Sequence, residues 1–140
     1  MAIYKLIIKK IKKMAIRFKV IEKGQPGVPG GGTKKFYATP VADGEVSLAE
    51  LTKAIEKICT VSGADIRAVL YSLVDVSIDN LANGTIVRLG DLGSMRITLS
   101  SEGKATEQEV TAASIKSTGI IFTPGTRLKE MLDAAKFQKE

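Results

Sequence analysis

The side chains that could do chemistry in this sequence are mainly cationic. The 140 residues contain 21 Lys and Arg, no His and a single Cys, Cys59. Without His, a Ser or Cys nucleophile lacks its usual base, and a zinc site would need more Cys than the chain has. No set of nucleophile, base and orienting group can be recognised. The sequence therefore predicts a protein that is not an enzyme and uses no metal or cofactor.

The basic residues are concentrated near the start of the chain. Residues 1–13 contain five Lys and no acidic residue, and residues 14–40 contain five basic residues and one Glu. Residues 41–140 contain eleven basic and fourteen acidic residues. The net charge of +6 therefore suggests a nucleic-acid partner mainly for one end of the chain.

One basic pair in this part of the chain stands beside two aromatic residues. Lys34 and Lys35 precede Phe36 and Tyr37, and cations next to aromatic rings suit contact with nucleic acid. The simpler interpretation is a strand whose aromatic side chains face the core.

The first 41 residues are predicted to hold a leader and a β-hairpin. Residues 1–13 form a Lys-rich leader. A secretory signal is not expected there, because Lys residues interrupt the apolar run and no cleavage site follows. No apolar run is long enough to span a membrane. Residues 15–21 alternate apolar and polar side chains, as a half-buried strand does. Residues 34–41 form a second strand, and the Gly- and Pro-rich stretch 24–32 connects the two into a hairpin at residues 14–41.

Two helices follow, each with a recognisable start. Ser47 and Glu50 form a capping box, and apolar residues then recur with helical spacing. Ser62 begins a longer helix, which Asn83-Gly84 ends. This second helix is apolar on more than one side, so we expect it to be buried. Cys59 falls within the apolar pattern and is expected to be a small core residue.

The rest of the chain is predicted to be a sheet and a final helix. Residues 85–89, 94–99 and 114–122 have the composition of strands. Residues 126–137 follow a Pro-Gly turn and have apolar side chains with helical spacing. This order of hairpin, two helices, three antiparallel strands and a helix is of the α+β class.

Two motifs in the second half of the chain carry a family resemblance. The first is Leu81-x-Asn83-Gly84-x-x-Val87-x-Leu89-x-x-Leu92-Gly93, and the second is Phe122-x-Pro124-Gly125-x-x-Leu128-Lys129. In this order, after two capped helices, they resemble the bacterial histone-like family of HU and integration host factor. The resemblance covers about residues 46–137, and the added hairpin resembles an HU-related subgroup.

The resemblance implies both a fold and a function. It implies an HU-like domain at residues 46–140, with two helices, a three-stranded antiparallel sheet with an extended arm, and a C-terminal helix. Two chains would intertwine as a homodimer. The β-arms and basic residues would contact the backbone or minor groove of double-stranded DNA with little sequence preference. The protein would lie in the bacterial cytoplasm, in the nucleoid, with no membrane and no small-molecule substrate.

The candidate DNA-binding residues are all basic. Arg96 and Lys116 lie near the base of the predicted arm, where the family contacts phosphates. Arg127 and Lys129 follow the Pro-Gly turn. The full set of candidates is Lys34, Lys35, Arg88, Arg96, Lys116, Arg127 and Lys129.

The predicted arm departs from the family in one respect. The family inserts an arm-tip Pro between base pairs to kink DNA, but residues 95–121 contain no Pro. Residues 99–118 carry two Lys and three Glu, and a negative tip would repel the DNA backbone. The wedge is therefore assigned to no residue. The alternative hypothesis is an HU-fold protein-interaction or assembly module without DNA bending, which would dock through an unpaired strand at residues 15–21.

Overall fold

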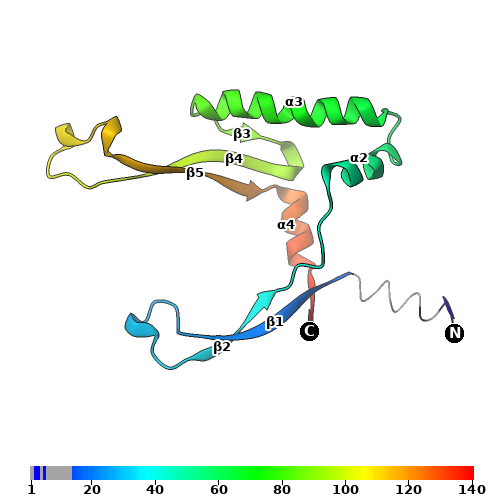
Figure 1. The fold of residues 1–140 in the computed structure, drawn as a ribbon, viewed down its shortest axis with the longest axis horizontal. Helices are drawn as coiled ribbons and strands as arrows, with labels where there is room; N and C mark the ends of the chain where they lie inside the picture. The colour runs from blue at the N-terminus through cyan, green and yellow to red at the C-terminus, as the bar shows by residue number, and fades with distance from the viewer. Residues whose placement is uncertain (1, 4, 6–13) are drawn as a thin grey trace. The chain divides into compact units, whose positions relative to one another are not determined.

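The computed structural model describes residues 2, 3, 5 and 14–140. Apart from residues 2, 3 and 5, the predicted Lys-rich leader lies outside the described residues. Residues 14–140 form an α+β structure with three α-helices and two three-stranded sheets (Figure 1). The helices are α2 Leu48–Glu56, α3 Gly63–Ala82 and α4 Thr126–Asp133. The strands are β1 Ala15–Lys23, β2 Lys35–Pro40, β3 Val87–Arg88, β4 Gly93–Ser101, β5 Ile115–Pro124 and β6 Lys136–Lys139.

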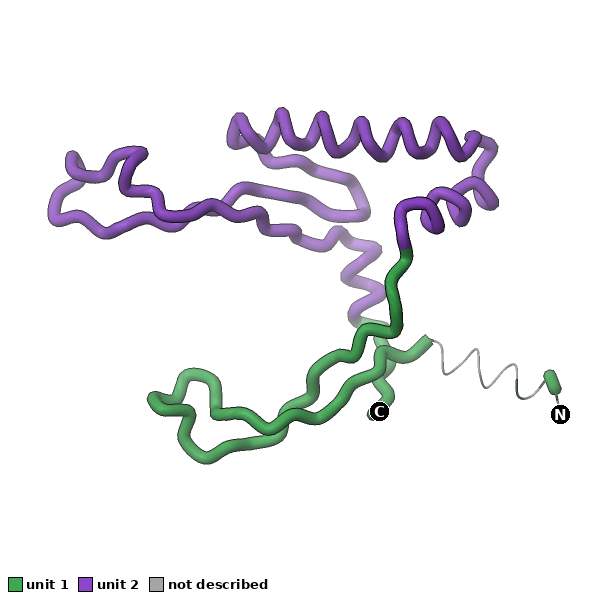
Figure 2. The backbone as a smooth tube through the Cα atoms, in the orientation of Figure 1, with its two compact units in different colours: residues 1–46, 133–140 green, residues 47–132 purple. Residues whose placement is uncertain are grey.

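The chain divides into two compact units (Figure 2). One unit contains residues 1–46 and 133–140, so it joins the two ends of the chain. The other contains residues 47–132 and holds all three helices except the last residue of α4, together with β3, β4 and β5.

The unit that joins the two chain ends is built on the β2-β1-β6 sheet. β1 and β2 pair antiparallel from Phe18–Pro40 to Lys23–Lys35, which confirms the predicted hairpin. β6 pairs parallel with the other edge of β1 at residues 15–18, so the prediction of an unpaired docking strand at residues 15–21 is wrong for that part of the strand. The Arg17 guanidinium lies 2.8 Å from Asp43 Oδ1 and 2.6 Å from Glu140 Oε1. The hydrogen bond to Asp43 and the charge of Glu140 raise the pKa of Arg17.

The prediction of one helix over residues 126–137 is wrong at its C-terminal end. α4 ends at Asp133, and residues 136–139 form β6. Apolar spacing alone extends the helix across Ala135. The strand forms instead because β1 offers an unpaired edge that is distant in the sequence, and such tertiary pairing overrides a local preference.

The helices of the second unit begin where local signals predict. Ser47 Oγ accepts a hydrogen bond from Glu50 N at 3.2 Å, and Glu50 Oε2 accepts one from Ser47 N at 2.9 Å. Ser62 Oγ accepts from Asp65 N at the start of α3. α3 ends at Ala82, and Gly84, two residues later, has a φ of +76° in the left-handed region that favours glycine. The hydrogen bonds accepted by the side chains of Ser47, Glu50 and Ser62 satisfy N–H groups that a helix start would otherwise leave unpaired.

Strands β3, β4 and β5 form a consecutive antiparallel sheet. β4 and β5 are each longer than predicted, and Figure 1 shows them running past the C-terminal end of α3 as an extended hairpin. The turn into α4 is held to the turn before β4, because Gly125 N donates to Leu92 O at 2.9 Å. A Cβ atom on Gly125 would overlap the Asp91 carbonyl group. The Pro-Gly turn therefore needs glycine for close backbone approach.

We expect Gly125→Ala to lower the free energy of unfolding by about 1–3 kcal/mol, because the added methyl group must push the Asp91 backbone away. Urea denaturation at one fixed protein concentration measures the change. Gly103→Ala is the matched control, since a methyl group there meets no atom within 4 Å. Equal losses in the two variants would show that the close approach is unimportant.

Candidate nucleic-acid interface

The β3-β4-β5 sheet has an apolar and a polar face, because successive residues of a strand point to opposite faces. Met95 and Ile97 of β4 pair with Phe122 and Ile120 of β5 on the apolar face. Met95 and Ile120 border an apolar hollow whose other lining residues come from α3: Leu73, Val74, Ser77, Ile78 and Leu81. The apolar face therefore lies toward α3.

The polar face carries several of the predicted basic residues. Arg88 of β3 pairs with Ser94 of β4, which also pairs with Thr123 of β5. Arg96 lies two residues after Ser94 and so points to the same face. The register of the sheet thus places two guanidinium groups among hydroxyl groups.

A hollow at one end of this face is lined by residues of the sheet and by a further cation, Lys129 of α4. The turn before α4 places Lys129 there, since Lys129 N donates to Gly125 O at 3.0 Å. The hollow is lined by Arg88, Gly90, Gly93, Ser94, Thr123, Pro124, Gly125 and Lys129, and we call it the basic hollow. Sequence motifs separated by about thirty residues therefore contribute to one site.

The groups around the basic hollow suit an anionic ligand. A guanidinium offers several N–H donors in a fixed fork, and a Lys ammonium adds a compact positive charge. Ser94 and Thr123 supply hydroxyl donors. The first N–H groups of α4 follow directly and favour negative charge at a helix start. Together they could hold the oxygens of a phosphate group.

The remaining candidates of this unit lie outside the basic hollow. Arg127 lies in the first turn of α4 and is exposed. Lys116 falls at a β-bulge, because Ser100 pairs with Ser117 whereas Ser101 pairs with Ile115. The basic hollow therefore gathers Arg88 and Lys129, Arg96 shares the polar face, and Lys116 and Arg127 are separate surface charges.

The tip of the β4-β5 hairpin is poor in available positive charge. Glu102 N donates to Ser114 O at 2.8 Å and closes the tip. Lys104 Nζ lies 3.0 Å from Glu102 Oε2, so one carboxylate neutralises this cation. Glu107 and Glu109 lie in a short 3₁₀ helix nearby. Positive charge on the polar face lies near the base of the hairpin rather than at its tip.

Lys34 and Lys35 belong to the other compact unit. Lys35 is the first residue of β2, and Lys34 directly precedes it. The simpler interpretation of this segment, in which the aromatic side chains face the core, is wrong for Phe36, which is 71% exposed. Phe36 pairs with Glu22, and these two residues lie on the face opposite Lys35.

Comparison with known proteins gives a family for the chain. Residues 14–139 match the model of a family described as HU-HIG, an HU domain fused to a winged helix-turn-helix, an Ig or a glycine-rich motif. The chain belongs to the HU-HIG family. No curated protein matches it.

A solved structure shares the fold of this HU-HIG chain. It is a protein from Bacteroides vulgatus ATCC 8482 described as a "putative bacterial DNA binding protein". The TM-score is 0.62 at 15% sequence identity, and the match covers 89% of this chain. It covers 48% of the other chain, so the HU-HIG chain spans about half the length of that protein.

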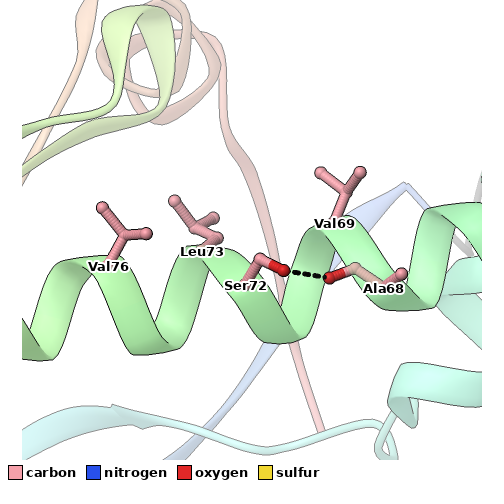
Figure 3. Close-up of a pocket in the computed structure, with 5 residues that line it drawn as sticks. All are labelled: Ala68, Val69, Ser72, Leu73 and Val76. Atoms are coloured by element: carbon pink, nitrogen blue, oxygen red, sulfur yellow. Dashed lines mark hydrogen bonds between the residues drawn. The ribbon is translucent and has the colours of Figure 1, made fainter.

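The long helix of the HU-HIG chain leaves apolar side chains uncovered. Figure 3 shows Val69, Leu73 and Val76 along one side of α3, beside the Ser72 hydroxyl, which donates to Ala68 O at 2.7 Å. Val69 is 65% exposed and Val76 is 59% exposed. Within the unit of residues 47–132 of a single copy, the prediction that this helix is buried on more than one side is therefore wrong for this side.

Cys59 also differs from its prediction. It is exposed rather than buried, although it lines an apolar hollow with Ile55, Val61 and Ile66. The residue follows the end of α2, where the helical pattern no longer fixes which way a side chain points.

Among the described residues, the structure shows neither a metal-binding cluster nor a membrane-spanning helix. In the part of the chain that the structure describes, no cluster of three or more His, Cys, Asp or Glu could hold a metal ion. None of the described helices is long and apolar enough to cross a membrane.

Sequence analysis missed two hydroxyl groups of the basic hollow, those of Ser94 and Thr123. The alternation of polar and apolar residues in Ser94-Met95-Arg96-Ile97 was a usable signal for the face of Ser94. The pairing of Ser94 with Thr123 depends on the strand register, which becomes visible only in the structure.

Proposed function

We propose that this chain is a non-enzymatic, HU-like DNA-binding protein that contacts the backbone of double-stranded DNA. The observation that carries the proposal is the basic hollow, where Arg88, Lys129, Ser94 and Thr123 line one space. The HU-HIG family match and the description of the structural neighbour as a DNA-binding protein support it. We propose the bacterial cytoplasm and nucleoid as its location.

The chemistry of this face favours contacts without strong sequence preference. Cations and hydroxyl groups bind phosphate oxygens, and such contacts position a protein on DNA without reading its sequence. Arg96 and Lys116 on the β4-β5 hairpin, and Arg127 at the start of α4, extend the contact beyond the basic hollow. Because the hairpin tip lacks Pro and carries Glu residues, we assign it no wedge between base pairs.

We further propose that the protein is a homodimer and that the HU-like domain, predicted at residues 46–140, has its helical core in the unit at residues 47–132. Ile66 and Leu81 are the buried large apolar residues of that unit. Folded proteins are only marginally stable, and so small a core is insufficient for a separate unit. A second copy that covers the exposed apolar side of α3 would complete the core.

A second function is favoured by one observation on the hairpin unit. Phe36 and Phe137, on β2 and β6, are 71% and 67% exposed on the same face of their sheet. Such a surface suits a protein-interaction or assembly module without DNA bending. A module of this kind would show no affinity for DNA at low salt, which separates the two functions in one titration.

We expect Arg88→Gln with Lys129→Gln to weaken binding to a labelled 30-base-pair duplex and to make it less salt-dependent. Each lost phosphate contact lowers the slope of log K against log salt by about 0.9, so the double variant should lose about 2. Fluorescence anisotropy across a salt series measures this slope. Lys53→Gln with Lys104→Gln removes the same charge from α2 and the neutralised tip, and should change the slope little. Equal effects of the two pairs would contradict the proposed interface.

We expect Val76→Asp to abolish the dimer, because it places a charge on the uncovered apolar side of α3. Light scattering coupled to gel filtration should give twice the 15.0 kDa chain mass for the wild type and a smaller or unfolded species for the variant. Val110→Asp, at a 51% exposed position near the hairpin tip, is the matched control. The urea midpoint of the wild type should also rise with protein concentration. A monomeric wild type with a constant midpoint would rule out the dimer.

A further inference from the structure

The β2-β1-β6 sheet presents a row of lysines on one face. Lys19 and Lys23 lie four residues apart on β1, so their side chains point to the same face of the sheet. Lys23 pairs with Lys35 of β2. Lys136 of β6 pairs with Ala15, four residues before Lys19, and so belongs to the same face. We call the surface made by Lys19, Lys23, Lys35 and Lys136 the basic face.

The basic face contains a repulsive contact that the fold itself does not need. Lys23 and Lys35 are direct cross-strand partners, and like charges in that position destabilise a sheet. The neighbouring Glu22 lies on the opposite face, as partner of Phe36. Within residues 14–140, Arg17 is the only cation of this unit that forms an ion pair, and its partners are Asp43 and Glu140. An anionic ligand would relieve the repulsion.

The contact between Lys23 and Tyr37 bears on which part of a nucleic acid the basic face would bind. Lys23 Nζ lies 5.0 Å from the centre of the Tyr37 ring, a cation–π contact that holds the ammonium group on this face. The same contact occupies one side of the ring, so that side is not available for a base to stack on it. The exposed groups of the face are ammonium groups, which pair with backbone phosphates.

The net charges of the two units also favour an anionic ligand at the basic face. The unit of residues 1–46 and 133–140 has twelve basic and five acidic residues, whereas the unit of residues 47–132 has nine basic and ten acidic residues. Five of the twelve basic residues are the Lys of residues 1–13, and the remaining seven include the four lysines of the basic face, so this unit is the positively charged one.

We propose that the basic face is a second site for DNA backbone phosphates, separate from the basic hollow and supplied by the β-hairpin together with the C-terminal strand. This proposal rests on the proposed DNA-binding function and identifies a further surface that performs it. Lys35 is thereby joined by three lysines that sequence analysis did not select: Lys19, Lys23 and Lys136.

The test compares two triple variants of the full chain. Lys19→Gln, Lys23→Gln and Lys35→Gln together remove most of the basic face. Lys53→Gln, Lys57→Gln and Lys104→Gln remove the same charge from α2, its C-cap and the hairpin tip. With a labelled 30-base-pair duplex in a salt series, the first variant should lose about 2–3 from the salt slope and at least tenfold in affinity at about 0.1 M salt, where surface charges still act over about 10 Å. The second should change affinity less than threefold.

A single substitution separates ligand binding from a structural role. Lys35→Glu turns the repulsive Lys23–Lys35 pair into an attractive one, so the melting temperature should rise. Affinity for the duplex should fall in the same variant, because a positive charge becomes negative on the basic face. A lower melting temperature, or unchanged DNA affinity, would overturn the proposal.

The outcomes also distinguish this proposal from the proposed DNA-binding function on which it rests. If the wild type does not bind the duplex at low salt, the proposed function fails. If the wild type binds with a steep salt slope and loses affinity only with Arg88→Gln and Lys129→Gln, the basic face alone is refuted. If the triple variant keeps its DNA affinity but loses binding to vesicles containing phosphatidylserine, the face serves an anionic membrane and the proposal is overturned.

Discussion

The antiparallel ladder between β4 and β5 is the interaction on which the candidate interface depends. Its register pairs Ser94 with Thr123 and Met95 with Phe122, which sets every side chain of both strands on one face or the other. A slip of one residue would exchange the faces. The apolar side chains would then leave α3, and the hydroxyl groups would leave the basic hollow. The same hydrogen bonds therefore support the packing of the helix and the position of the charges.

The two compact units divide charge and apolar packing unevenly. The unit of residues 47–132 carries the family motifs but is close to neutral, and its hairpin tip is acidic. The unit of residues 1–46 and 133–140 carries the excess positive charge, partly in residues 1–13 and partly on an added sheet. In the proposed function, positively charged surfaces outside the hairpin tip provide the attraction to DNA that an acidic tip cannot give.

The exposed side of α3 connects folding with assembly. A helix with so many uncovered apolar side chains gains stability when another surface removes them from water. If that surface is a second copy, the folded state and the dimer form together, and stability depends on protein concentration. The positions of the cations of the basic hollow would then depend on the dimer as well, because α3 supports the sheet that carries them.

Sequence alone determined the features that arise from neighbouring residues. The caps at Ser47 and Ser62, the end of α3 just before Asn83-Gly84 and the β1-β2 hairpin all follow from short-range hydrogen bonding and local backbone preference, and the structure confirms them. Tertiary structure decided what depends on distant partners. It placed β6 beside β1, opposed Lys23 to Lys35, and brought Arg88 and Lys129 to one hollow. Strand pairing joins residues that are far apart in the chain, and no local pattern specifies which free edge a short segment will meet.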